Sequence, residues 1–133
     1  MPIKFREIYV LESYTSGTSW YRIWSDGWCE QGGRIYYSTQ IFSTTINFLK
    51  AFIDSNYCVV SGCVKDHGTS SDRWATGMCN ILNMSGTSMD LYFYLDSRDN
   101  DNTYIFWYTS GRLAINQYTI PQNYYQNLVI KYN

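Results

Sequence analysis

Residues 19–33 read SWYRIWSDGWCEQGG, and this stretch decides the fold because two strand patterns meet in it at a tight turn. Residues 20–24 and 28–31 each alternate between two sets of side chains, as strands do when successive residues face opposite sides of a sheet. The Asp26-Gly27 pair between them predicts a hairpin, since Gly supplies the positive φ that such turns need. Gly32-Gly33 then predicts a bulge or a close approach of the backbone.

Alternation of the same kind recurs along the chain, with turn-forming residues, Ser110-Gly111 among them, roughly every ten positions. It predicts strands over residues 5–13, 18–24, 28–37, 42–48, 57–64, 73–83, 88–96, 103–108, 112–118 and 127–132. Residues 46–53 also fit a short helix, and we interpret them as a strand that ends in a brief turn. Many short strands with regular turn signals indicate a sandwich or barrel. We therefore expect a single all-β domain over residues 1–133.

Length and charge exclude several classes of protein. The chain has 133 residues with ten basic and eleven acidic side chains, for a net charge of −1. A nucleic-acid-binding surface would show clustered Lys and Arg, so we expect no nucleic-acid partner. No apolar run approaches the ~20 residues of a membrane span, and the first residues lack the apolar core of a secretory signal. We expect synthesis in a cytoplasm and no membrane insertion.

Aromatic residues make up 19 % of the chain, with 14 Tyr, 5 Trp and 6 Phe. Strands use aromatic side chains well, and Tyr suits half-wet surfaces where both its ring and its hydroxyl find partners. Sheet cores, protein interfaces and sugar-binding faces all share this preference. A chain so rich in strands must also cover its exposed sheet edges, and self-association is one way to do so.

The run from Tyr21 to Gly33 resembles the signature of the C-terminal knob domains of bacteriophage tail fibres. In those knobs a hairpin that ends in Gln-Gly-Gly or Gln-x-Gly precedes a run of alternating Thr and apolar residues, and a Trp-bearing aromatic strand follows. The matching pieces here are, in order, Gln31-Gly32-Gly33, Ser43–Phe48, Phe52, Asn56–Val60 and Tyr104–Tyr108 with Gly111. The resemblance spans roughly Glu7 to Gly111, and the chain continues past the usual end of such knobs to Asn133.

The resemblance implies an antiparallel β-sandwich of the jelly-roll-like knob type, assembled as a homotrimer because tail-fibre knobs are trimers. It implies a location in the virion, at the tail fibre, and attachment to a bacterial surface receptor, either a polysaccharide or a surface protein. Several weak sites acting together would supply the affinity. Two alternatives remain open: a structural virion part, such as a fibre trimerisation cap or capsid decoration, and a glycan-degrading depolymerase.

We expect the receptor-binding residues in the polar stretch around His67 and in a late turn. Loops carried on a rigid sheet are a usual place for recognition. Aromatic faces there would stack on sugar rings, and charged groups would hold hydroxyls or acidic substituents. The candidate residues are Asp66, His67, Asp72, Arg73, Trp74, Tyr124 and Tyr125. A solvated connection without a ligand is the alternative interpretation.

Catalysis is not indicated. Asp66, His67 and either Ser70 or Ser71 contain the elements of a Ser-His-Asp set, but a triad needs separate elements that hold its members rigidly. A glycosidase needs two placed carboxylates, and the glutamates are at positions 7, 12 and 30 only. We expect Glu30 to pair with Arg22 across the hairpin, which is a structural role. The sequence therefore predicts a protein that is not an enzyme.

No metal or cofactor site is indicated either. The Asp- and Asn-rich residues 96–102 lack the Gly and Glu that an EF-hand calcium loop places at fixed positions. The four cysteines, at positions 29, 58, 63 and 79, lack the spacing of a zinc site, so we expect all four to be reduced and buried. Cys58 and Cys63 lie an odd number of residues apart, which predicts opposite faces of a strand.

Overall fold

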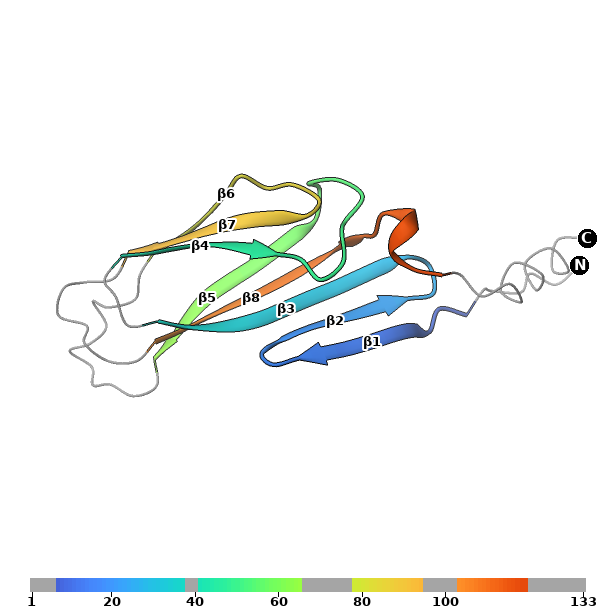
Figure 1. The fold of residues 1–133 in the computed structure, drawn as a ribbon, viewed down its shortest axis with the longest axis horizontal. Helices are drawn as coiled ribbons and strands as arrows, with labels where there is room; N and C mark the ends of the chain where they lie inside the picture. Colours follow the sequence, from blue (N-terminus) through green and yellow to red (C-terminus); the bar gives the residue numbers. More distant parts are fainter. Residues whose placement is uncertain (1–6, 38–40, 66–77, 95–102, 120–133) are drawn as a thin grey trace, which may run out of the picture.

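Two antiparallel sheets face each other in the computed structural model, which describes residues 7–37, 41–65, 78–94 and 103–119 (Figure 1). The larger sheet has the order β1-β2-β3-β8-β5 and the smaller has the order β4-β7-β6. The strands are β1 (Val10–Ser16), β2 (Ser19–Trp24), β3 (Trp28–Tyr37), β4 (Ile41–Asn47), β5 (Cys58–Lys65), β6 (Met78–Leu82), β7 (Ser88–Tyr94) and β8 (Thr103–Arg112). The predicted all-β antiparallel fold is confirmed.

From β3 to β8 the chain changes sheet at every connection except β6–β7. Double-sheet arrangements of this kind are found in jelly rolls. β1 and β2 extend the larger sheet beyond the smaller one at one edge (Figure 1). Within the described residues, no helix is long and apolar enough to cross a membrane.

The β2–β3 hairpin forms where it is predicted. Gly27 has a φ of +88°, a conformation that favours glycine, and its N–H donates to the carbonyl of Trp24 at 2.9 Å. Gly32 and Gly33 continue the ladders with β2 and β8 without a register shift, so the alternative of a bulge is wrong. Close approach is the correct alternative: a Cβ on Gly32 would lie 2.8 Å from the Trp20 ring, and one on Gly33 would lie 2.8 Å from the indole nitrogen of Trp107.

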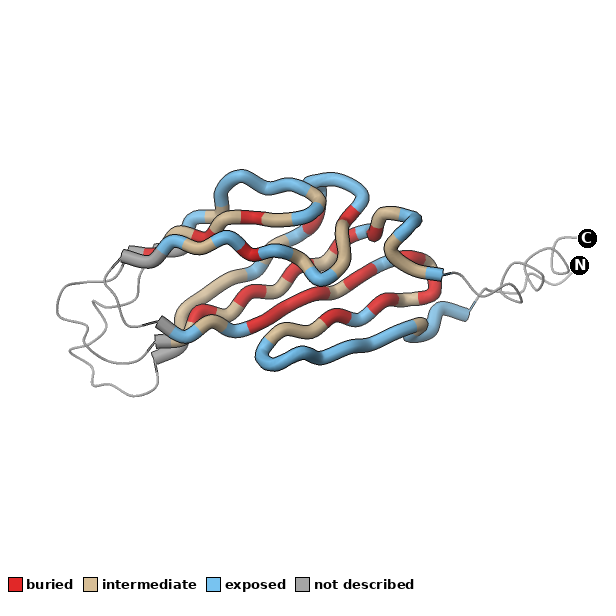
Figure 2. Tube along the Cα trace, in the orientation of Figure 1, coloured by how far each residue is buried: buried red, intermediate tan, exposed pale blue. Residues whose placement is uncertain are grey.

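The core lies between the two sheets (Figure 2). It is built from the residues that alternate toward the facing sheet, and the fully buried ones include Ile23, Cys29, Met89, Leu91, Phe93 and Ile105. Four rings pack together within and against this core. Phe48 contacts Phe52, Tyr57 and Trp107 at centroid distances of 5.2, 5.1 and 6.1 Å. Residues 48–57 form no helix, which confirms a strand that ends in a turn.

The expected strand over residues 112–118 is wrong, and so is the turn expected at Ser110-Gly111. β8 continues through both residues to Arg112, and the chain then makes a short 3₁₀ turn at Ile115–Gln117. Gly111 serves close packing: a Cβ there would lie 2.7 Å from the Cβ of Tyr57. A Gly that signals a turn in the sequence thus makes room for a neighbouring ring.

Three other expectations need correction or fall outside the structure. Residues 7–9 were expected in the first strand but precede it: β1 begins at Val10, and its register with β2 shifts between Val10 and Glu12. Cys29 is buried and free, as expected, whereas Cys58 is exposed because its pairing with Ser110 places it on the outer face of the larger sheet. The strand expected over residues 127–132 lies outside the described residues.

Candidate functional site

Three connections of the chain attach at the same end of the sandwich. Thr103 pairs with both Tyr37 and Lys65, and Tyr94 pairs with both Ile41 and Met78. The strand ends that flank residues 38–40, 66–77 and 95–102 therefore lie together (Figure 1). We call this the loop end.

The described first and last residues meet at the opposite end. The N–H of Ser25, in the β2–β3 turn, donates to the carbonyl of Tyr9 at 2.8 Å. The ring of Tyr118 lies against Gly27 of the same turn. We call this the terminal end, and it lies at the other extreme of the long axis from the loop end (Figure 1).

The binding residues predicted from the sequence cannot be compared with the structure. Asp66, His67, Asp72, Arg73 and Trp74 lie between β5 and β6, outside the described residues, and so do Tyr124 and Tyr125. Lys65 and Met78 bracket the first group, and both lie at the loop end.

A hollow of about 460 Å³ lies on the outer face of the larger sheet, beside the loop end, and is lined by Thr18, Arg34, Tyr36 and Tyr104. We call it the outer pocket. The rings of Tyr36 and Tyr104 meet edge to face with centroids 5.4 Å apart, and the guanidinium carbon of Arg34 lies 4.6 Å from the centre of the Tyr104 ring. Tyrosine rings and an arginine offer stacking faces and fixed donors, which suit a hydroxylated or acidic ligand.

The outer face also holds a hydrogen-bond network around Glu30. Its carboxylate accepts from the indole N–H of Trp24 and from the hydroxyl of Tyr108, each at 2.7 Å. The register places Arg22 directly opposite Glu30, as the sequence predicts. Burial by itself would raise the pKa of the Glu30 carboxyl, but the bonds from Tyr108 and Trp24 and the charge of Arg22 together hold the pKa below its ordinary 4.5. These contacts give Glu30 a structural role.

This pKa predicts a pH dependence of stability. A group whose pKa is lowered by folding stabilises the folded state above its unfolded pKa, and that stabilisation is lost as the pH falls through the folded pKa. The free energy of unfolding should therefore decline more between about pH 6 and pH 3 in the parent chain than in Glu30→Gln. Urea unfolding at several pH values measures both curves. Parallel curves would contradict the prediction.

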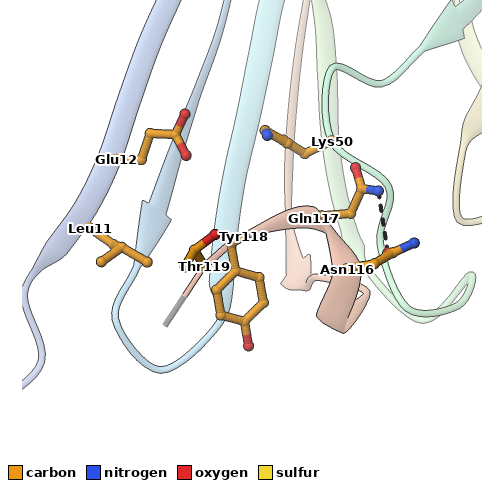
Figure 3. Close-up of a pocket in the computed structure, with 7 residues that line it drawn as sticks. All are labelled: Leu11, Glu12, Lys50, Asn116, Gln117, Tyr118 and Thr119. Carbon is orange, nitrogen blue, oxygen red and sulfur yellow. Dashed lines mark hydrogen bonds between the residues drawn. The ribbon is translucent and has the colours of Figure 1, made fainter. Parts of the chain in front are cut away.

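A second hollow, of about 450 Å³, opens at the terminal end between β1 and the residues that follow β8 (Figure 3). We call it the terminal cleft, and its lining residues are Leu11, Glu12, Lys50, Asn116, Gln117, Tyr118 and Thr119. The hydroxyl of Tyr21 donates to Glu12 Oε1 at 2.7 Å, and Lys50 Nζ lies 5.3 Å from the centre of the Tyr21 ring. Burial and the bond to Glu12 raise the pKa of Tyr21 to about 12, so the hydroxyl remains a donor.

A buried amide side chain holds the Lys50 backbone beside this cleft. Gln31 is fully buried; its Nε2 donates to the Lys50 carbonyl at 2.7 Å, and its Oε1 accepts from the Lys50 N–H at 2.9 Å. The next residue is held as well, because Gln117 Oε1 accepts from the N–H of Ala51 at 2.9 Å. The position of Lys50 is therefore fixed by two side chains from separate parts of the sequence.

Sequence reasoning missed both hollows. The sequence contains a weak signal for the outer pocket, since alternation places Arg34, Tyr36 and Tyr104 on one face of their strands. The terminal cleft had none, because its lining comes from β1, the segment after β4 and the segment after β8. Gln31 belongs to the hairpin motif, but no local pattern indicates that its side chain holds residue 50.

No protein-family model and no curated protein sequence matches the chain. Its structure is similar to that of the R1 pyocin fibre of P. aeruginosa (C-terminal residues 323–701), with a TM-score of 0.56 and 15 % identity, covering 76 % of this chain and 28 % of that one. For an N-truncated R1-type pyocin tail fibre the TM-score is 0.54 and the identity is 13 %, and the match covers 79 % of this chain and 85 % of that one. For an N-truncated R2-type pyocin tail fibre the TM-score is 0.51 and the identity is 13 %, and the match covers 77 % of this chain and 38 % of that one. The chain thus has a fold found in pyocin tail fibres, and it spans well under half of the first and third of these chains.

Proposed function

We propose that this chain is a non-catalytic receptor-binding domain of a bacteriophage tail fibre or pyocin fibre, located in the particle and attaching it to a bacterial surface polysaccharide or surface protein. The observation that carries the proposal is the fold shared with pyocin tail fibres, combined with the convergence of three connections at the loop end. Attachment requires a surface that points away from the rest of a fibre. The position of the loop end, at the far extreme of the long axis from the terminal end, supports it as that surface.

The composition of the loop end supports recognition of sugars or acidic groups. Residues 66–77 supply Asp66, His67, Arg73 and Trp74 from a connection flanked by two strands. The outer pocket adds aromatic rings and a guanidinium within the same region. Rings that stack on sugar faces, with charged groups that bind hydroxyls or carboxylates, form the usual chemistry of such recognition.

A non-catalytic role is supported by the placement of two of the glutamates. Glu12 pairs in register with Ile23, which faces the core side of the larger sheet, whereas Glu30 is opposite Arg22 on the outer side. The two carboxylates of a glycosidase must flank one sugar bond, about 5–10 Å apart. Carboxylates on opposite faces of one sheet do not meet this need, so Glu12 and Glu30 cannot form such a pair.

We propose further that the domain acts as a homotrimer. The larger sheet ends in the edge strands β1 and β5, and edge strands are surfaces that proteins normally cover. The edge strand β1 also exposes large apolar side chains, including Val10 and Tyr14. Three identical sites on one tip would multiply a modest affinity per site.

Replacement of Trp74 by Ala tests the binding site. An aromatic anchor at a recognition surface often contributes 2 kcal/mol or more, so particles with Trp74→Ala should adsorb to host cells at least about tenfold less well. Adsorption is measured by counting unbound particles after incubation with cells. Multi-angle light scattering should give the same trimer mass for the variant and the parent chain.

Trp28→Ala is the matched control, because Trp28 is an exposed tryptophan near the terminal end. It should leave adsorption unchanged. Normal adsorption of Trp74→Ala would remove Trp74 from the site. Failure of the purified parent chain to bind host cells or to compete with adsorption would contradict the proposed function itself.

A further inference from the structure

The terminal cleft contains two opposite charges that do not neutralise each other. Figure 3 shows Glu12 and Lys50 on the two sides of the cleft, and within the described part of the chain no ion pair joins them. We propose that the terminal cleft binds one neutral pyranose unit of a saccharide, with its hydroxyls bridging Glu12 and Lys50. This site is separate from the loop end and goes beyond the proposed function.

Both charged groups keep hydrogen-bonding capacity for a ligand. The Glu12 carboxylate accepts from Tyr21 through Oε1, and a carboxylate has about four acceptor positions on its two oxygens. The Lys50 ammonium carries three donors, and its contact with the Tyr21 ring is a cation–π contact that uses no hydrogen bond to an acceptor. A hydroxyl group both donates and accepts, so neighbouring hydroxyls of a sugar match this pair.

The cleft is organised before a ligand arrives. Tyr21 holds Glu12 by a hydrogen bond and supports Lys50 with its ring, so one buried residue positions both charges. Gln31 fixes the Lys50 backbone through two hydrogen bonds. Binding to groups already held in place avoids part of the entropic cost of ordering them.

The charge balance and size select the class of ligand. A net anion would face Glu12 and a net cation would face Lys50 at close range, so a neutral ligand is favoured. The volume of about 450 Å³ falls in the range of roughly 300–1,000 Å³ that small-molecule sites occupy. Leu11 and Thr119 line the same cleft and offer an apolar surface for the C–H face of a sugar and one more hydroxyl.

The test uses the full chain, labelled with ¹⁵N, and titrates it with the methyl glycosides of glucose, galactose and mannose. At least one glycoside should shift the amide signals of Glu12, Lys50 and Thr119 with a millimolar dissociation constant, and leave that of Val60 in place. Glu12→Gln retains an acceptor for Tyr21, and Lys50→Met retains the aliphatic stem over the ring. Each variant should bind about tenfold more weakly, since hydrogen bonds to charged groups are the strong ones.

Val60→Thr is the control, because Val60 is exposed on the outer face of β5, and it should bind like the parent chain. The amide spectrum of each variant shows whether it is folded. Glu12→Gln and Lys50→Met test the two sides of the cleft independently of each other. Absence of shifts at the cleft with every glycoside would overturn the proposal. So would equal affinity in parent and both folded variants, or stronger binding of glycylglycine than of any glycoside. Loss of adsorption by Trp74→Ala with intact sugar binding at the cleft would separate the two sites.

Discussion

Trp107→Ala should lower the free energy of unfolding by about 3–5 kcal/mol, the range for removal of a buried large aromatic side chain. Trp107 is 5 % exposed, lies against Gly33 and contacts Phe48. The larger sheet and the segment after β4 therefore lose contacts when the indole is removed. Gly33 has no side chain that could fill the space left by the indole. The melting temperature should fall by about 10 °C in a domain of this size.

Trp28→Ala is again the matched control, because Trp28 is 39 % exposed and its indole N–H bonds only to the hydroxyl of the half-buried Ser110 in the described part of the chain. Its loss should change stability by about 1 kcal/mol or less. Urea unfolding followed by circular dichroism measures both variants. Equal stabilities for the two variants would show that the packing of Trp107 between the sheets is not as described.

Gln31→Leu should destabilise the fold by about 2–4 kcal/mol although the new side chain is apolar and similar in size. Gln31 is fully buried, and its amide satisfies both the N–H and the carbonyl of Lys50. Leucine removes both hydrogen bonds and leaves the N–H and the carbonyl of Lys50 without these partners at a half-buried position. Each such group costs about 1–3 kcal/mol.

Gln117→Leu is the comparison variant, since Gln117 is only half-buried and satisfies a single backbone N–H. It should cost about 1 kcal/mol. The amide signal of Lys50 gives a second measurement, because it should move strongly in Gln31→Leu and little in Gln117→Leu. Gln31→Leu with the stability of the parent chain would contradict the role of the amide.

Local patterns in the sequence predicted most of the strands. β3 has the predicted ends, and β2 and β7 begin within one residue of expectation, because each alternates strictly and is bounded by turn-forming residues. One of the errors occurs where a Gly has a packing role. Gly111 signalled a turn in the sequence, yet it lies inside β8 because Tyr57 occupies the space of a side chain there. Local patterns carry no information on such a distant neighbour.

The position of Cys58 shows a similar limit. The odd spacing from Cys63 predicted opposite faces correctly, but it could not say which face the smaller sheet covers. That depends on which strands pair and on which sheet each belongs to. The predicted binding residues between Asp66 and Trp74, and at Tyr124 and Tyr125, remain predictions because they lie outside the described residues.

The sequence by itself determined the all-β class, the β2–β3 hairpin and the pairing of Arg22 with Glu30, because alternation and turn chemistry act between residues close in the chain. Only the tertiary structure decided that Gln31 holds Lys50, that Glu12 and Lys50 share one cleft, and that three connections leave at one end. These features join residues from separate strands and loops. Strand order and sheet packing determine such contacts, and no single segment of the sequence specifies either of them.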